Sequence, residues 1–312
     1  MIPGNLRARV VDLGFAAGWG AVKSLPGPVA ARAFRAAADA AAARNGKGTK
    51  QLRRNLRRVV PHATTSELDE LVGQGLRSYA RYWLETFRLP RMDRDTVVAL
   101  ADANTTGAEH IDAAGHAGKG LILALPHMGN WDVAALWLIA HGYPFTTVAE
   151  RLKPESLFDR FVAYRESLGM EVLPLTGGQS TPSDVLAARL RAGGAICLVA
   201  ERDLSRNGIE VQFFGEAAKM PGGPALLAAK TGAALLPVSL WFTPDGWGQW
   251  IGAPIELPGA RLTDHVRGGT QALADVFAER IAEHAADWHM LQRLWLADLP
   301  VRVAALNGHR TG

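Results

Sequence analysis

The 312-residue sequence lacks several features that would assign it to a class of protein at once. It has one cysteine, Cys197, so a disulfide framework is excluded, which fits a reducing compartment. Because Cys197 lies in the apolar run 195–200, we expect a small buried side chain rather than a nucleophile. No stretch approaches the ~18 consecutive apolar residues of a membrane-spanning helix. With no Pro-, Gly- or Ser-rich linker and no internal repeat, the sequence predicts a single domain over residues 1–312.

Several motifs that define enzyme classes are also missing. The chain has no Gly-x-Ser-x-Gly elbow, no phosphate-binding loop that ends in lysine, and no dinucleotide-binding fingerprint. The pair His284 and His289 is five residues apart, a spacing that does not place two ligands on one helix face. We therefore expect neither a metal site nor a cofactor.

Positive charge is concentrated at the start of the chain. Residues 1–60 contain 12 Lys and Arg against two Asp, a net charge of +10 in a protein whose total is +4. Such a segment suits an anionic partner, such as a lipid surface, a nucleic acid or a phosphorylated ligand, or simply forms solvated helix faces. Nucleic acid is disfavoured because the basic half lacks interleaved aromatic residues and a recognisable module. Residues 6–23 are amphipathic and fit either a helix in the membrane interface or one packed on the body.

The first hundred residues show only helical patterns and predict a basic, membrane-facing layer. Helices are expected over 29–44, from Thr49 or Lys50 to just before Pro61, and from Ser66 to about residue 87. Ser66 and Asp69 are expected to form a capping box. The apolar stripe of the last helix is expected to face the core and contains Leu68, Leu71, Leu76, Tyr79, Tyr82, Trp83 and Phe87.

From about residue 118 the pattern changes to alternating strands and helices. Strands are predicted over 120–126, 145–149, 171–175, 195–200, 211–214, 234–241 and 249–255. Helices are predicted over 131–141, 154–168, 182–192, 222–231 and 264–285. This alternation predicts an α/β core over residues 101–312, with a largely parallel central sheet flanked by helices on both faces.

Polar residues follow three of the predicted strands. His127 comes directly after strand 120–126, and Glu150 and Glu201 each follow another strand. If the sheet is parallel, these three residues surround one crevice at the edge where α/β proteins bind ligands. A histidine there can take a proton from a hydroxyl or from water near neutral pH. The pattern therefore indicates a transferase or hydrolase.

The partner of His127 is less certain from sequence. Asn130 is the expected N-cap of helix 131–141, which puts Asp132 in the first turn of that helix. Asp132 could fold back to orient the imidazole, or could only favour the helix dipole. We expect Asp132 as the first partner of His127 and Glu201 as the second. Backbone amides near Gly129, or an arginine, are candidate donors to an oxyanion.

The chain resembles the bacterial membrane acyltransferases of the lipid A acyltransferase type. The resemblance is carried by Pro126-His127-Met128-Gly129-Asn130-Trp131-Asp132, Glu201-Arg202-Asp203, Phe213-Phe214-Gly215, Met220-Pro221-x-Gly223-Pro224-Ala225 and Thr231-Gly232-Ala233. Residues 146–157 and 286–292 carry a narrower similarity to the actinobacterial branch that acts on phosphatidylinositol mannosides.

The resemblance implies transfer of a palmitoyl chain from acyl-CoA to the 6-hydroxyl of a mannose on a phosphatidylinositol mannoside. It implies that His127 is the base and that Asp132 and Glu201 support it. Glu150 and Arg165 would contact the mannose, and Arg202 would also bind substrate. It further implies peripheral attachment at the cytoplasmic face of the plasma membrane.

Two alternatives to an acyltransferase remain at this point. The chain could be a non-enzymatic lipid-binding protein whose basic helices hold it on anionic membranes. It could also be an acyl-CoA thioester hydrolase that activates water instead of a sugar hydroxyl. For an acyltransferase, helix 131–141 is the expected wall of a groove for the acyl chain.

Overall fold

The computed structural model describes the chain except for residues 1–19, 21, 23, 152–154, 177–180 and 300–312. The amphipathic helix expected over residues 6–23 therefore falls almost entirely outside the described residues. Within them, no helix is both long enough and apolar enough to span a membrane.

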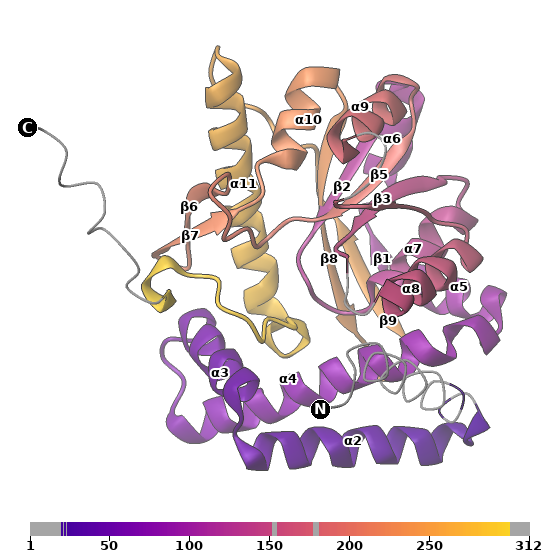
Figure 1. Cartoon of the computed structure of the whole chain (residues 1–312), viewed down its shortest axis with the longest axis vertical. Helices are drawn as coiled ribbons and strands as arrows, with labels where there is room; N and C mark the ends of the chain where they lie inside the picture. Colours follow the sequence, from indigo (N-terminus) through magenta and orange to yellow (C-terminus); the bar gives the residue numbers. More distant parts are fainter. Residues whose placement is uncertain (1–19, 21, 23, 152–154, 177–180, 300–312) are drawn as a thin grey trace, which may run out of the picture.

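In the described part of the first hundred residues, three helices form an N-terminal layer, as predicted. They are α2 (Gly27–Arg44), α3 (Lys47–Val59) and α4 (Thr65–Arg88), and α2 and α4 run side by side below the rest of the molecule (Figure 1). The predicted capping box at Ser66 and Asp69 is wrong. The N-cap is Thr64, two residues earlier, where the Thr64 hydroxyl accepts the Glu67 N–H and the Glu67 carboxylate accepts the Thr64 N–H. Thr64-x-x-Glu67 is the standard pair because the longer glutamate side chain reaches back.

The described residues contain a seven-stranded sheet in the order β1-β9-β8-β2-β5-β3-β4. The strands are β1 (Thr105–Thr106), β2 (Leu121–Leu125), β3 (Phe145–Ala149), β4 (Glu171–Pro174), β5 (Ala195–Val199), β8 (Ala234–Phe242) and β9 (Trp247–Ile251). All pairs from β8 to β4 are parallel, and β9 is antiparallel to β8. The prediction of a largely parallel sheet is confirmed.

The predicted strand 211–214 lies outside this sheet. It belongs to an antiparallel hairpin of β6 (Ile209–Phe213) and β7 (Glu216–Met220). The turn consists of Phe214 and Gly215, which have φ values of +50° and +77°. Two consecutive positive φ angles are the geometry of a tight two-residue hairpin turn, which the apolar periodicity of the strand does not reveal.

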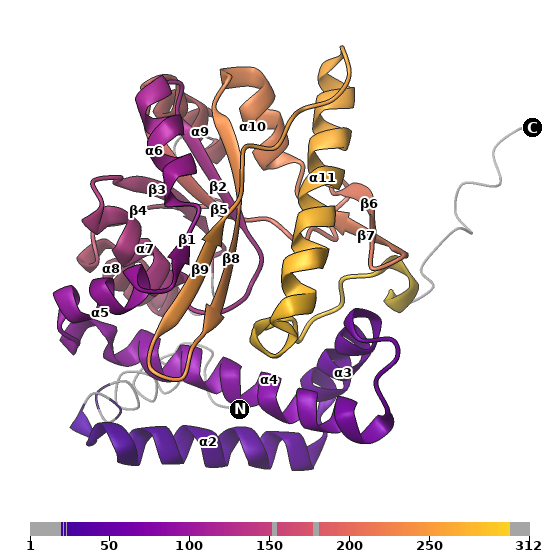
Figure 2. The same ribbon diagram turned by 180° about the vertical axis from the view of Figure 1, so that it is seen from behind.

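Helices cover both faces of the sheet, as expected (Figures 1 and 2). One face carries α5 (Arg94–Asp102), α6 (Ala108–Ala117), α7 (Trp131–Ala140) and α8 (Glu155–Ser167). The other carries α9 (Pro182–Arg191), α10 (Gly223–Thr231) and α11 (Leu262–Glu283). The short elements α5, β1 and α6 were not predicted.

The strand order creates a switch point between β2 and β5. The chain leaves β2 through α7 towards β3 on one side, whereas it leaves β5 through α10 towards β8 on the other. Right-handed crossovers place these two helices on opposite faces, and the carboxyl ends of the two strands are the position at which open α/β sheets usually bind ligands.

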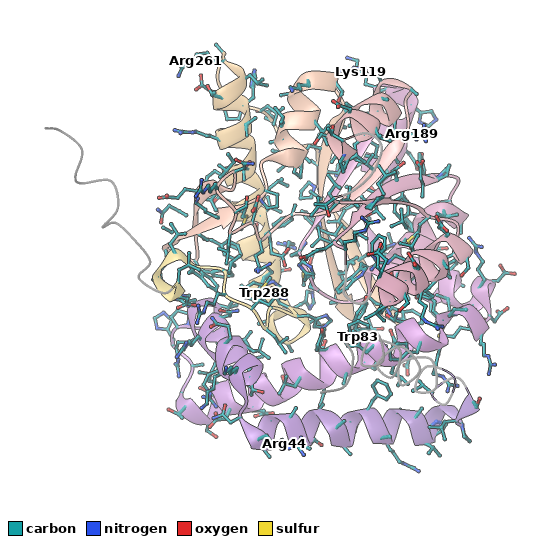
Figure 3. The ribbon with its side chains drawn as sticks, viewed as in Figure 1. Arg44, Trp83, Lys119, Arg189, Arg261 and Trp288 are labelled. Atoms are coloured by element: carbon teal, nitrogen blue, oxygen red, sulfur yellow. The ribbon has the colours of Figure 1, made fainter. Side chains whose placement is uncertain are left out.

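The helical layer lies against this edge of the sheet. The segment after α11, with the 3₁₀ turns η2 (Ala285–Asp287) and η3 (Leu296–Asp298), passes between the layer and the sheet. Figure 3 places Trp288 at this junction, and its side chain is fully buried. The Asn55 amide of α3 donates to the carbonyls of Met290 (2.7 Å) and Gln292 (2.8 Å), which fastens the segment to the layer.

Candidate functional site

The residues 126–130 form a tight loop between β2 and α7. Gly129 adopts φ +57°, and a Cβ there would lie 2.7 Å from the carbonyl carbon of Leu240, so a larger residue is excluded. The side-chain oxygen of Asn130 accepts the N–H groups of Asp132 (3.1 Å) and Val133 (3.2 Å). The predicted N-cap is therefore confirmed, and it fixes where the loop ends and α7 begins.

His127 and Glu201 meet at the switch point. β2 and β5 pair in parallel register, so the residues that follow them lie side by side. Oε1 of Glu201 accepts the main-chain N–H of His127 (2.7 Å) and lies 2.8 Å from its Nδ1. Glu201 is fully buried, whereas the His127 side chain is 43% exposed. The expectation that these two strand ends converge is confirmed.

The protonation of the pair follows from its surroundings. Burial would lower the pKa of His127, but the Glu201 carboxylate raises it, and the result is a pKa above the ordinary 6.5. Burial would raise the pKa of Glu201, but His127 holds it below its ordinary value. Glu201 is thus a carboxylate that accepts the Nδ1–H of His127. The other ring nitrogen, Nε2, then carries the lone pair that can take a proton.

The expectation that Asp132 is the first partner of His127 is wrong. Asp132 is only 1% exposed, and its Oδ1 lies 3.2 Å from Nε of Arg165. Its Oδ2 accepts longer hydrogen bonds from Thr86 (3.3 Å), Tyr82 (3.4 Å) and Tyr164 (3.4 Å). Asp132 lies in the first turn of α7, whereas His127 lies in the preceding loop, and the Asp132 carboxylate is directed at Arg165 and the hydroxyls of α4 and α8. Asp132 therefore holds Arg165.

Glu150 and Arg202 lie at the same edge of the sheet but do not join the His127–Glu201 pair. Glu150 is exposed after β3, which is separated from β2 by β5, a distance of two strand spacings or about 10 Å. Nε of Arg202 donates to the carbonyl of Arg293 (3.0 Å), and its charge lowers the pKa of His127. Of the three residues expected around one crevice, two are in contact.

An apolar cavity lies between α7 and the sheet. Its walls include Trp131, Ala134, Ala135, Trp137 and Leu138 of α7, alternate residues of β2 and β5, and residues of β3, β8 and β9. Asp132 and Arg165 also line it, and the ring centre of Trp131 is 5.8 Å from that of His127. Helix α7, the expected wall of the acyl-chain groove, thus lines an apolar cavity. Cys197 lines the cavity too, and burial raises its pKa, which keeps the thiol neutral.

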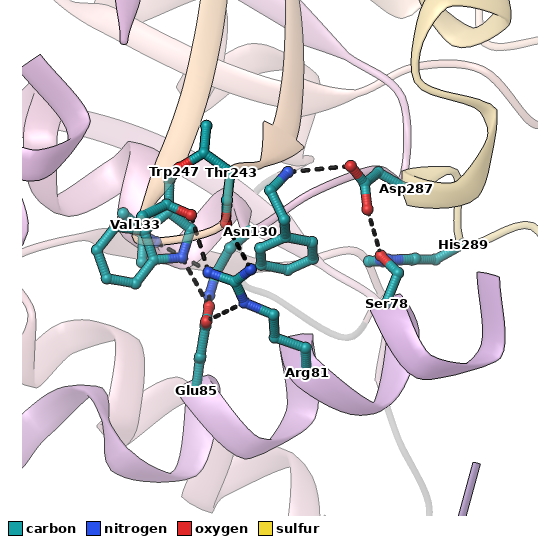
Figure 4. A network of polar contacts seen from close by, with 11 residues as sticks. Ser78, Arg81, Glu85, Asn130, Val133, Thr243, Trp247, Asp287 and His289 are labelled. Carbon is teal, nitrogen blue, oxygen red and sulfur yellow. Dashed lines mark hydrogen bonds and ion pairs between the residues drawn. The ribbon is translucent and has the colours of Figure 1, made fainter. Parts of the chain in front are cut away.

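Residues of α4 reach the loop and were not identified from the sequence (Figure 4). The Glu85 carboxylate accepts from the Asn130 amide and the Trp247 indole, both at 2.7 Å, and pairs with Arg81. The Tyr82 ring packs on Trp131 with 4.0 Å between centroids. The sequence feature that could have identified them is the pair Arg81 and Glu85, four residues apart beside the aromatic stripe of this helix.

Comparisons with known proteins point to one family. Residues 6–297 match the family model described as bacterial lipid A biosynthesis acyltransferase. The chain is 54% identical over 294 residues to a protein of Mycolicibacterium smegmatis (strain ATCC 700084 / mc(2)155) named phosphatidylinositol mannoside acyltransferase, covering 94% of each chain. It is 52% identical over 288 residues to a protein of the same name from Mycobacterium tuberculosis (strain ATCC 25618 / H37Rv), covering 92% of this chain and 89% of that protein.

Proposed function

Because the chain belongs to the bacterial lipid A biosynthesis acyltransferase family, we propose that it moves palmitoyl from acyl-CoA to a mannose 6-hydroxyl of a phosphatidylinositol mannoside. The observation that carries the proposal is a half-exposed histidine that is paired with a buried carboxylate and whose ring centre lies 5.8 Å from that of Trp131, a residue lining the apolar cavity. A base, an apolar chain site and an exposed approach for a polar acceptor are what such a transfer needs.

His127 acts as the general base in this proposal. Its Nε2 takes the proton of the mannose hydroxyl while the oxygen attacks the thioester carbonyl, and Glu201 stabilises the imidazolium that forms. The tetrahedral intermediate then expels the CoA thiolate, which takes the proton back from Nε2, so that the products are the ester and free CoA. General base catalysis of this kind contributes roughly 10²–10⁴-fold to the rate.

Arg165 is the proposed cation for the oxygen atoms of the reacting groups. The N–H of Gly129, a candidate donor to the oxyanion, already donates to the carbonyl of Asp287 (2.9 Å). Arg165 lines the cavity beside Asp132, which supports a role in contacting either the oxyanion or the mannose hydroxyls. Glu150 and Arg202 lie at the same sheet edge and are the proposed outer contacts of the acceptor headgroup.

The helical layer is the proposed membrane-facing surface, and a peripheral position on the cytoplasmic face of the plasma membrane follows from it. Lys47, Lys50 and Arg54 of α3 are exposed. Helix α4 of the same layer contacts the loop of residues 126–130, which carries the proposed base and is called the catalytic loop below. A lipid acceptor drawn from the bilayer would thus meet His127 without leaving the surface. Sedimentation with liposomes should depend on anionic lipid and weaken as salt rises.

The test is a transfer assay with purified protein, palmitoyl-CoA and phosphatidylinositol mannoside in liposomes. CoA release is followed with a thiol reagent and the product by mass spectrometry. We expect equimolar CoA and acylated mannoside, and a loss of about 10²–10⁴-fold in His127→Ala. His265→Ala, a half-buried histidine of α11, is the matched control and should keep the wild-type rate.

Three outcomes would contradict the proposal. Equal CoA release with and without acceptor identifies a thioester hydrolase. A rate in His127→Ala above about one hundredth of wild type removes His127 as the base. Lipid binding without any turnover, unchanged in His127→Ala, identifies a non-enzymatic membrane protein.

A further inference from the structure

The segment after η2 pairs with the catalytic loop. Met128 and Trp288 form an antiparallel bridge, the N–H of His289 donates to the carbonyl of His127 (2.7 Å), and the N–H of Gly129 donates to the carbonyl of Asp287 (2.9 Å). The main chain of His127 is therefore held on both sides, since Glu201 accepts its N–H and His289 binds its carbonyl. Holding both peptide groups fixes the direction in which the imidazole leaves the backbone.

Three side chains, the buried Ser78 and His289 and the partly buried Asp287, hold this segment in place (Figure 4). The Ser78 hydroxyl of α4 donates to Oδ1 of Asp287 (2.6 Å) and lies 2.9 Å from Nε2 of His289. Oδ2 of Asp287 accepts the N–H of Phe242 at the end of β8 (3.0 Å). Ser78 is 9% and His289 is 7% exposed. The cluster therefore connects the helical layer, the sheet and the segment that pairs with the loop.

The proton arrangement of this cluster is fixed by its geometry. Ser78 has one hydroxyl proton, which it gives to the Asp287 carboxylate, so Nε2 of His289 must carry the proton that it donates to Ser78. Nδ1 of His289 is buried and has no hydrogen-bond partner among the described residues. Burial, helped by the charge of His127, lowers the pKa of His289 to about 3, so its ring is neutral at physiological pH.

The order of these groups differs from that of a nucleophilic triad. In such a triad the imidazole lies between the hydroxyl and the carboxylate, so that it can take the hydroxyl proton. Here the hydroxyl lies between the carboxylate and the imidazole, and its proton already points to the carboxylate. Ser78 is thus neither activated nor open to a substrate.

We propose that Ser78, Asp287 and His289 are positioning residues that clamp the 287–289 segment onto the catalytic loop and so hold His127 against Glu201. The proposal deepens the function given above, because its consequence for turnover rests on His127 being the base. It also assigns a role to the 286–292 sequence motif, which the catalytic pair itself does not use. Through Ser78, the clamp makes the position of the base depend on the helical layer.

The test compares His289→Leu, Ser78→Ala and His289→Gln. The amide nitrogen of glutamine can take the place of Nε2 and donate to Ser78, whereas leucine cannot. Asn55→Ala is the matched control: it removes bonds to the same segment at residues 290 and 292 but leaves the 287–289 pairing intact. Each variant is measured for its melting temperature, for kcat and KM in the transfer assay, and for the pKa of His127 by NMR titration.

In His289→Leu and Ser78→Ala we expect the pKa of His127 to fall, because the imidazole moves away from Glu201. The other charged groups that face His127, Arg165 and Arg202, are unchanged. kcat should fall about tenfold or more, since small misplacements of a base are costly, while KM for acyl-CoA changes little. His289→Gln should restore both values, and Asn55→Ala should lower only the melting temperature.

An unchanged pKa of His127 in folded His289→Leu would overturn the proposal, as would an equal fall in Asn55→Ala. If Leu and Gln at position 289 behave alike, the hydrogen bond to Ser78 has no positioning role and the proposal is wrong. The NMR titration needs no substrate. A failure of the transfer assay in the wild-type protein therefore refutes the proposed function and leaves the clamp tested on its own.

Discussion

Glu201→Gln is the substitution that tests the proposed pairing of His127 with Glu201 most directly. It keeps the size of the side chain and leaves an oxygen that can accept the two N–H groups of His127, but it removes the charge. In the structure both N–H groups converge on Oε1, and Oε2 has no hydrogen-bond partner among the described residues. The amide group of glutamine can therefore occupy the Oε2 position without displacing another contact.

The expected loss follows from the charge on the acceptor. A hydrogen bond to a charged group contributes ~1.5–3 kcal/mol and a neutral one ~0.5–1.5 kcal/mol. The two bonds to His127 therefore lose about 2–3 kcal/mol in total when Glu201 becomes neutral. The part that counts is the ring bond, which strengthens as the imidazole becomes a cation in the transition state. The ring bond accounts for about 1–1.5 kcal/mol of this loss, so at about 1.4 kcal/mol for each factor of ten we expect kcat/KM to fall roughly 5- to 10-fold.

The pH profile should shift in a defined direction. In the wild-type protein Glu201 keeps the pKa of His127 above 6.5, so activity falls as pH drops through that raised value. Without the charge, the remaining influences on the His127 pKa are burial, Arg202 and Arg165, and all of them lower it. The acid limb of Glu201→Gln should therefore lie below pH 6.5. The maximal rate of Glu201→Gln is lower than that of the wild-type protein, but it persists to a lower pH.

The assay is kcat/KM for CoA release and mannoside acylation between pH 4.5 and 8, with folding checked by circular dichroism. Glu171→Gln is the matched control, because Glu171 is on the edge strand β4 and pairs with Arg189 away from the loop. A Glu201→Gln variant with a wild-type rate and an unmoved acid limb would refute the pairing of His127 with Glu201. So would an acid limb that moves to higher pH.

Three further predictions concern stability and the cavity. Asp132→Asn should lower the free energy of unfolding in urea by about 3 kcal/mol, because it leaves the guanidinium of Arg165 without its buried carboxylate; an unchanged midpoint would contradict the ion pair. Ala135→Phe adds a ring to the cavity wall, so KM should rise for palmitoyl-CoA but not for decanoyl-CoA. Equal effects on KM for both donors would show that the cavity does not bind the acyl chain. Because folding lowers the pKa of His289 to about 3, the unfolded chain binds a proton there first, and stability should fall as pH drops from about 6.5 towards 3; His289→Gln should lose less over that range.

Much of the architecture could be predicted from the sequence because local periodicity reports it. The strand β2, its turn at His127 and the capped helix α7 follow from an apolar run, a break and an Asn at the N-cap. The parallel sheet follows from the alternation of such units. The hairpin of β6 and β7 was not predicted, because its turn has two positive φ angles without one of the usual turn dipeptides.

The candidate site was predicted only in part. Both His127 and Glu201 were identified, because each follows a buried strand and parallel strands bring their ends together. The ranking of the two candidate partners of His127 was wrong, because proximity in sequence placed Asp132 before Glu201. The direction of a side chain in the first helical turn then aimed that carboxylate at Arg165.

The sequence by itself determined which side chains stand at the carboxyl edge of the sheet, that a histidine is among them, and that an acyltransferase motif surrounds it. These are properties of residue order and spacing along one strand or helix. Only the tertiary structure decided which carboxylate binds the imidazole, that a cavity lies beside it, and that Ser78, Asp287 and His289 meet behind it. Those contacts join residues up to 211 positions apart. The pattern of residues along the chain does not show which of such distant segments pack against one another.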